Sequence, residues 1–248
     1  MMMRFLFLNF VLLSLLLSCQ QKKPSQAKDQ AKEKTLQESL HRQKIEKTYN
    51  YDTYLQNDFA ALELLWIKAK DSIKLKIFYQ PENDLKIIKK DTSFLYVSDN
   101  QFFESPSGSF KTSDLESFKH IVQAYSLPYQ LSNYQIEKTT DSLQLNDETS
   151  LTRSYYLNGN NNLRLFLSPH TDLIKLIEFS DLSESTYLVY DKYITVQQIP
   201  ISMRWSFYKN AVSEENAKSR VEVRKISYPD QLPVDFKVPT SAKPVLNN

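Results

Sequence analysis

The sequence predicts a mainly β protein with flanking helices (α+β), built as a curled antiparallel half-barrel of about 10–11 strands covered by a helix. Three observations support this fold class. Short segments with a hydrophobic period of two recur along most of the chain, short polar turns separate them, and a single amphipathic helix interrupts the series. Because βαβ units would place a helix between most strands, the pattern favours a sandwich or barrel-like sheet.

The N-terminus predicts export and lipidation. Met1–Arg4 form a short positive segment, and Phe5–Leu17 form an apolar run that is shorter than the ~20 residues of a membrane-spanning helix. The run ends in Leu16-Leu17-Ser18-Cys19, which resembles the lipobox of bacterial lipoproteins. Residues 1–18 are therefore predicted to be a signal peptide, and Cys19 is predicted to carry the lipid. The alternative is an ordinary signal peptide, or a short anchor, with a chance cysteine.

The next segment predicts a tether. Residues 19–34 comprise the lipidated cysteine and a polar stretch without large apolar side chains, which is typical of a flexible linker. No acidic cluster follows the cysteine, and Lys22 and Lys23 stand there instead, so an outer-membrane anchor facing the periplasm is expected. Residues 35–248 are predicted to form one domain, which opens with a helix over Thr35–Lys47 with Leu36, Leu40 and Ile45 on one side.

Alternating hydrophobicity places the strands. Ile73, Leu75, Ile77 and Tyr79 alternate with polar or outward residues, and Asn158-Gly159 predicts a hairpin turn between two later strands. Strands are predicted within Ile73–Tyr79, Phe94–Val97, Leu151–Leu157, Leu163–Leu167, Leu173–Phe179, Tyr187–Val196, Ile201–Phe207 and Val221–Val223.

The covering helix is predicted from a capping box. Ser113 and Glu116 have the spacing of reciprocal N-terminal caps. An apolar face follows at helical spacing, and Pro128 is expected to end the helix. The residues of that face are Leu115, Phe118, Val122 and Tyr125.

Composition argues against several functions. Removing Arg4 with the signal peptide leaves 30 of the 31 basic residues against 29 acidic ones, a net charge of +1 that argues against nucleic acid as a partner. The chain has two glycines and one cysteine, which disfavours phosphate-cradling loops and internal disulfides. His41, His120 and His170 lack metal-ligand spacing. No serine nucleophile motif occurs, so we expect no enzyme, no metal and no cofactor; an exported hydrolase is a minor alternative.

Large apolar side chains on the predicted strands are the candidate ligand-binding residues. A sheet that curls without closing, with a helix over its mouth, leaves room for an acyl chain. The alternative is that these side chains fill an ordinary core. The candidates are Trp66, Ile77, Phe94, Tyr96, Met203, Trp205 and Phe207.

The order of several local signatures resembles the lipoprotein-carrier superfamily of LolA and LolB, over about residues 36 to 246. The similar segments are Phe78-Tyr79-Gln80-Pro81 with Leu85-Lys86-Ile87, Phe94–Asn100, the helix from Ser113 to Tyr125, Leu165–Ile174, Tyr190–Tyr193 with Ile199–Met203, and Leu232–Pro239. Gln80 departs from the pattern, because the soluble carrier has in its early strands an arginine tied to closing its helical lid.

The resemblance implies a concave hydrophobic surface for lipid or acylated protein. The first hypothesis is therefore an anchored periplasmic lipoprotein that binds acyl chains or lipoproteins, with Leu127-Pro128-Tyr129 as an exposed tip for handover. The second is a structural or assembly subunit of an envelope complex, with a filled core, no ligand, and protein partners bound through an outer face or the helix from Thr35 to Lys47.

Overall fold

The computed structural model describes residues 24–69, 71–81, 85–98, 101–108, 110–139, 143–145, 148–150, 153–158, 163–180 and 185–245. The predicted signal peptide, Cys19 and the turn at Gly159 lie outside these residues. The chain divides into two units, residues 1–40 and residues 41–248, and the second contains the whole sheet.

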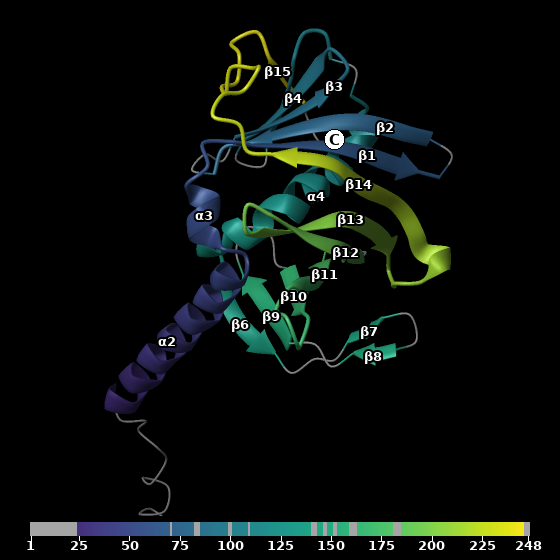
Figure 1. The fold of residues 1–248 in the computed structure, drawn as a ribbon. Helices are drawn as coiled ribbons and strands as arrows, with labels where there is room; N and C mark the ends of the chain where they lie inside the picture. Colours follow the sequence, from purple (N-terminus) through teal and green to yellow (C-terminus); the bar gives the residue numbers. More distant parts are fainter. Residues whose placement is uncertain are drawn as a thin grey trace, which may run out of the picture. The chain divides into compact units, whose positions relative to one another are not determined.

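In the described residues, three α-helices accompany the strands (Figure 1). Helix α2 spans Pro24–Thr48, so the helix predicted to begin at Thr35 is longer than expected and includes much of the expected tether. Helix α3 spans Tyr51–Leu55, and helix α4 spans Leu115–Ser126. In the described part of the chain no helix combines the length and the apolar character needed to cross a membrane.

The main sheet has thirteen strands in the order β15-β5-β4-β3-β2-β1-β14-β13-β12-β11-β10-β9-β6. All its pairings are antiparallel, and in the described residues the edge strands β15 and β6 do not pair with each other, so the sheet stays open. Their bounds are β1 Ala60–Lys68, β2 Asp71–Tyr79, β3 Lys86–Lys90, β4 Ser93–Ser98, β5 Gln101–Glu104, β6 Gln135–Thr139, β9 Arg153–Asn158, β10 Leu163–Leu167, β11 Ile174–Ser180, β12 Ser185–Val196, β13 Ile199–Lys209, β14 Ala217–Ser227 and β15 Lys243–Val245. A separate hairpin pairs β7, Leu143–Leu145, with β8, Glu148–Ser150.

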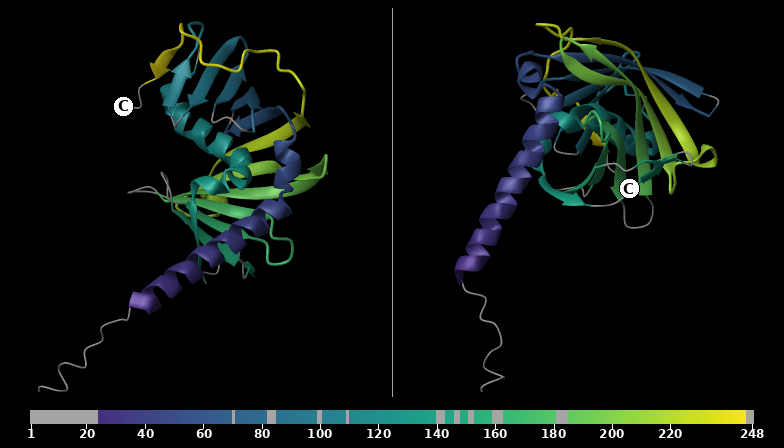
Figure 2. Two further views of the ribbon diagram at one scale, coloured as in Figure 1. Left: turned by 90° about the vertical axis from the view of Figure 1, so that its left-hand side faces the viewer. Right: turned by 60° about the horizontal axis from the view of Figure 1, so that its bottom comes forward.

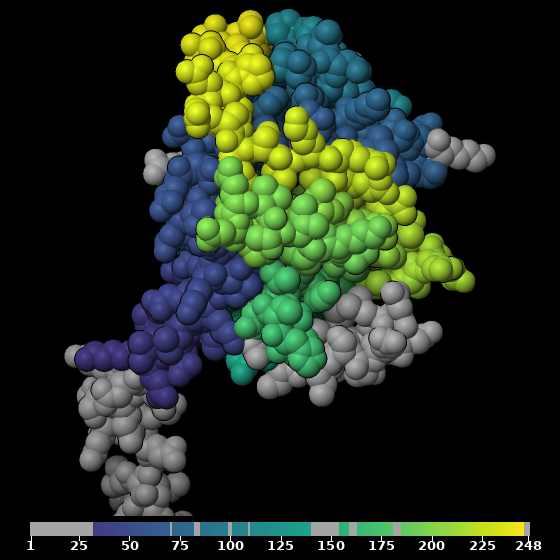
Figure 3. All heavy atoms as spheres, viewed as in Figure 1, coloured from purple at the N-terminus to yellow at the C-terminus, as the bar shows by residue number. Residues whose placement is uncertain are grey.

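The sheet curls around helix α4, as the two views in Figure 2 show. Two meanders, β1 to β5 and β9 to β14, join where β1 pairs with β14. In the second meander, β13 pairs with β14 only over Arg204–Tyr208, so Ile199–Met203 of β13 do not pair with β14. From outside, the side chains of β12 to β14 form a continuous surface (Figure 3). The predicted curled half-barrel with a covering helix is therefore confirmed, with more strands than expected.

Helix α4 confirms its predicted apolar face but not its predicted cap. Leu115, Phe118, Val122 and Tyr125 are all buried. The capping box is wrong, because a 3₁₀ turn at Thr112–Asp114 leads into the helix and its N-terminus has no side-chain cap.

The C-terminal strap, residues 228–242, covers the outer side of the first meander. Its apolar side chains pack on an outer cluster formed by strands β2 to β4, and it ends as β15 paired with β5. The outer cluster comprises Phe78, Leu85, Ile87 and Tyr96, with Phe94, Leu232, Val234, Phe236 and Val238 packed against it.

Candidate ligand-binding interior

The concave side of the sheet and helix α4 form one apolar interior. Inner-face residues of β1 and β2 pair across the strands, as in Leu62 with Ile77 and Leu64 with Leu75, and all four side chains are buried. Helix α4 places Phe118 against this face, with its ring centroid 5.2 Å from that of Trp66 in an edge arrangement. The helix therefore occupies the space that the predicted ligand would need.

Two tryptophans line the interior from the two strands on either side of β14. Trp66 of β1 and Trp205 of β13 both pair with Val221 of the intervening strand β14, so they flank it on the same face. Each side chain is 1% exposed. Neither indole Nε1 has a hydrogen-bond partner among the described residues. A buried donor without an acceptor costs about 1–3 kcal/mol, so these are two polar positions that the protein itself leaves unsatisfied.

Tyrosine rings fill the end of the interior beside α3 and the C-terminus of α4. Tyr54 of α3 stacks on Tyr129 with centroids 3.7 Å apart, and Tyr125 lies 5.8 Å from Tyr129 and 4.7 Å from Tyr79. Tyr49 meets Tyr129 edge-on at 6.1 Å. The rings form a contiguous aromatic cluster that joins the leading helices, α4 and the sheet.

The tyrosine hydroxyls bind helix α4 to the sheet. Tyr79 Oη donates to the Val122 carbonyl at 3.2 Å, and Tyr190 Oη donates to the Ala124 carbonyl at 2.7 Å. Carbonyls in the last turn of a helix lack intrahelical partners, so the Tyr190 hydroxyl supplies a C-terminal cap from β12.

A second hydroxyl pair ties the turn between α2 and α3 to the sheet. Tyr49 Oη lies 2.9 Å from Tyr193 Oη and accepts from the Ile174 amide at 2.9 Å, while Tyr193 Oη donates to the Ile174 carbonyl at 2.7 Å. Burial raises the pKa of both phenols far above ordinary values, and it raises the pKa of Tyr228 to about 12. These groups therefore remain protonated donors at physiological pH.

An ion pair fixes the other end of α4. Lys68, at the end of β1, pairs through Nζ with the Asp114 carboxylate just before α4, and the same Nζ lies 4.2 Å from the Trp66 ring centroid. Asp114 is among the few buried charged residues of the described chain. Both ends of α4 are thus held by polar contacts, while its middle is held by apolar packing.

A cavity of about 10 Å³ lies among the interior side chains, lined by Trp205, Tyr129 and Tyr190 among others. This volume is about that of one water molecule, far below the space that an acyl chain needs. With α4 in place, side chains fill this part of the interior.

The structure separates the predicted site residues into two groups. Trp66, Ile77, Trp205 and Phe207 are buried in the interior, and Met203 is partly buried against it. The other two, on β4, point to the opposite face: Tyr96 belongs to the outer cluster, and Phe94 packs against it. One surface therefore cannot contain all seven residues, because neighbouring Leu95 and Val97 are the β4 residues that face the interior.

One further expectation from the sequence is wrong. Leu127-Pro128-Tyr129 is not an exposed tip, because all three residues are buried in a 3₁₀ turn that continues α4. The described residues contain no group of three His, Cys, Asp or Glu side chains that could hold a metal ion. The interior tyrosines were not predicted as site residues; the pair at Tyr190 and Tyr193 within the family-like segment was the available signal.

Comparison with known proteins places the fold. No protein-family model matches this sequence, and no curated protein matches it. Among solved structures, the chain is similar to a LolA superfamily protein from Nitrosomonas europaea, with a TM-score of 0.50 and 10% identity over 78% of this chain and 97% of that one. It is also similar to a DUF1329 family protein from Desulfovibrio piger, with a TM-score of 0.50 and 8% identity over 76% and 94% of the two chains. The fold is LolA-like, as the order of the sequence signatures predicted.

Proposed function

We propose that this chain is an exported lipoprotein, anchored through Cys19 at the outer membrane and facing the periplasm, that binds an acyl chain of a lipid or lipoprotein on its concave sheet face. Binding requires helix α4 to leave that face. The observation that supports the proposal is the apolar concave face of an open sheet, which helix α4, of 12 residues, covers. The LolA-like fold supports the same reading, and no catalytic step is part of it.

The energetics of exchange are close to balanced. Helix α4 buries five large apolar side chains against the sheet, Leu115, Phe118, Ile121, Val122 and Tyr125. At about 1.5–3 kcal/mol each, they contribute about 8–15 kcal/mol. An acyl chain of about fourteen methylenes contributes about 11 kcal/mol at about 0.8 kcal/mol per methylene. A long acyl chain can therefore balance the apolar packing of the helix, whereas a short chain cannot.

The test is photo-crosslinking in cells that express the full chain and are fed a photoactivatable palmitate. Adducts mapped to peptides of β1 or β13 that contain Trp66 or Trp205 are the expected result. Ile77→Ala on the interior face should reduce the adduct, while Phe94→Ala in the outer cluster should leave it unchanged, which makes the two variants a matched pair. Adducts confined to the peptide that carries Cys19 would refute the proposal.

The alternative function is an assembly subunit with a permanently filled core. The cavity of about 10 Å³ and the hydrogen-bonded tyrosines around it favour this alternative. In that case no interior adduct forms in any variant, while Ile77→Ala still lowers the free energy of unfolding by about 2–5 kcal/mol. The crosslinking experiment therefore separates the two functions.

A further inference from the structure

Strand β2 has a free edge over half its length. Strand β1 pairs with all of Asp71–Tyr79, but β3 reaches only Lys76–Tyr79 on the other side. Within the described residues, Asp71–Leu75 therefore have no strand partner on the β3 side. In an antiparallel sheet every second residue directs both its N–H and its C=O to a given side, so this edge presents unpaired donors and acceptors.

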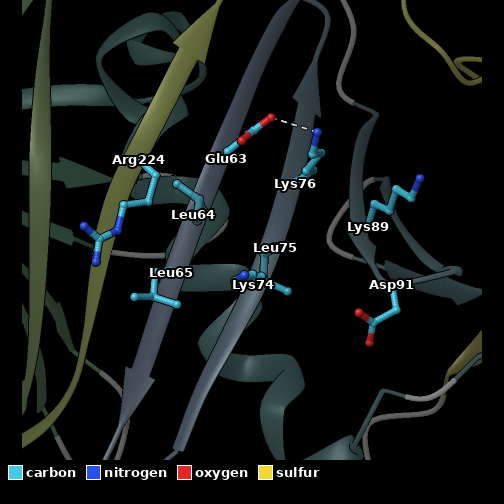
Figure 4. A pocket seen from close by; sticks show the side chains of 9 residues that line it. All are labelled: Glu63, Leu64, Leu65, Lys74, Leu75, Lys76, Lys89, Asp91 and Arg224. Carbon is cyan, nitrogen blue, oxygen red and sulfur yellow. Dashed lines mark ion pairs between the residues drawn. The ribbon is translucent and has the colours of Figure 1, made fainter.

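A groove of about 650 Å³ lies beside this edge (Figure 4). Its charged lining is contributed by Glu63 of β1, Lys74 and Lys76 of β2, Lys89 of β3, Asp91 in the turn that follows β3, and Arg224 of β14. These strand residues alternate with the interior-facing Leu64 and Leu75, so their side chains lie on the outer face. The volume is within the range of about 300–1,000 Å³ that is usual for ligand pockets.

The groove carries an excess of positive charge. Four of its six charged residues are basic and two are acidic. Glu63 is neutralised by Lys76, with 2.8 Å between the carboxylate oxygen and Nζ, and Arg224 pairs with Glu222. Lys74 is exposed and forms no ion pair within the described chain, and Lys89 Nζ lies 5.5 Å from the Phe94 ring centroid. Lys74, Lys89 and Asp91 therefore remain without an ion-pair partner among the described residues, which leaves the groove with one net positive charge.

We propose that the free edge of β2 and this groove bind an acidic, extended segment of a partner polypeptide, which adds to the sheet as a strand beside Asp71–Leu75. The unpaired backbone of the edge would pair with the backbone of the segment, and carboxylates on its outward side chains would meet Lys74 and Lys89. The charged side chains of the site lie on the opposite face from the interior, whereas Leu64 and Leu75, which also line the groove, belong to the interior core.

Charge also decides against a second copy of this chain. Edge-to-edge pairing of two β2 strands in a register centred on Lys74 would bring the Lys74 of one copy opposite the Lys74 of the other, and like charges across a strand pair are destabilising. Lysines on an exposed edge are a common protection against such pairing. The same lysines favour a segment that carries carboxylates, because the protecting charges then become attractive.

The experiment measures fluorescence anisotropy of a labelled peptide of about ten alternating valine and aspartate residues, the length of a strand, with the full chain. The peptide should bind, and Lys74→Glu combined with Lys89→Glu should weaken binding about tenfold, since two attractive pairs become repulsive. Lys138→Glu on β6, at the far edge of the sheet, is the control and should leave binding unchanged.

Methylation of the peptide backbone distinguishes strand addition from simple attraction. The same peptide with an N-methyl group on every residue keeps its charge but loses the hydrogen-bond donors of both edges, so it should not bind. Equal binding of the methylated peptide would overturn the proposal in favour of a general anion surface. Vesicles of phosphatidylglycerol that compete for the same lysines would overturn it in the same way. Failure of the unmethylated peptide to bind the correctly folded chain would overturn it as well.

Discussion

The protonation of His120 provides a quantitative test of how helix α4 packs. The imidazole is 6% exposed, and its ring centroid lies 4.2 Å from that of Phe179 on β11. Burial lowers the pKa of His120 from 6.5 to about 4, with Lys119 adding a smaller effect in the same direction. In the folded protein the imidazole is therefore neutral at pH 5 to 6, while in the unfolded chain it is largely protonated below pH 6.5.

This difference fixes the sign and size of the effect on stability. Between pH 6.5 and about 4 the unfolded state binds more protons than the folded state, so acid favours unfolding. The contribution is complete above pH 6.5 and disappears as the pH falls to about 4, a loss of about 3 kcal/mol at about 1.4 kcal/mol per pKa unit. Glu116 Oε1 lies 3.7 Å from His120 Nε2 and attracts the protonated ring, but its side chain is 56% exposed and water screens most of this attraction.

The assay is urea unfolding of the full chain and of His120→Phe at pH 7.5 and at about pH 4. Carboxylates contribute equally to both proteins, so they cancel in the difference between the two. The wild-type chain should lose about 3 kcal/mol more than the variant over this interval. Parallel pH profiles of the two proteins would refute the burial of a neutral imidazole between α4 and β11.

The other predictions concern the contacts that hold the interior together, each measured by equilibrium urea unfolding. Tyr190→Phe should cost about 1–3 kcal/mol, because it leaves a helix carbonyl of α4 without its donor. Tyr187→Phe, whose hydroxyl meets a carboxylate on the outer face, should cost less, and an equal cost would contradict the capping role. Trp66→Ala should cost about 3–5 kcal/mol in a filled interior, and a loss below about 1 kcal/mol would indicate space around the ring. Lys68→Met should cost about 2 kcal/mol by leaving the buried Asp114 carboxylate alone, and adding Asp114→Asn should restore part of the loss; a strictly additive double variant would argue against the pair.

Periodicity predicted the strands best where only one of their faces is apolar. The predicted segment Ile73–Tyr79 lies within β2, where Lys74 and Lys76 alternate with apolar residues, and the predicted segment at Ile201–Phe207 is the centre of β13. The same method could not orient strand β4, because Phe94, Leu95, Tyr96 and Val97 are all apolar. The local sequence therefore does not show which pair of side chains faces inward. The C-terminal strap covers the outer pair, and that contact joins residues more than a hundred positions apart in the chain.

The ends of helix α4 show a second limit of local reasoning. The spacing of Ser113 and Glu116 satisfies a capping rule, but the Asp114 side chain is already engaged by Lys68, so the chain enters the helix through a 3₁₀ turn instead. The contact between Asp114 and the end of β1 is tertiary, and a rule based on spacing within four residues does not include it.

The tyrosines could not be assigned from sequence for a different reason. A tyrosine has an apolar ring and a polar hydroxyl, so its position is decided by whether a partner for the hydroxyl exists at the end of the ring. Here the partners are the carbonyls of α4 and the hydroxyls of other tyrosines, all contributed by segments distant in sequence. The number of tyrosines, 15 in the whole chain, was visible, but their convergence was not.

The same hydroxyls restrict what could replace helix α4. If the helix leaves the concave face, Tyr79 and Tyr190 lose their acceptors, and each unsatisfied donor costs about 1–3 kcal/mol. The indole N–H groups of Trp66 and Trp205 already lack partners on the same face. A plain hydrocarbon would balance the apolar packing of the helix but would leave all four donors unsatisfied. A ligand that joins a long acyl chain to ester or amide carbonyls supplies acceptors as well, so the polar atoms of this interior favour acylated lipids and acylated polypeptides over hydrocarbons.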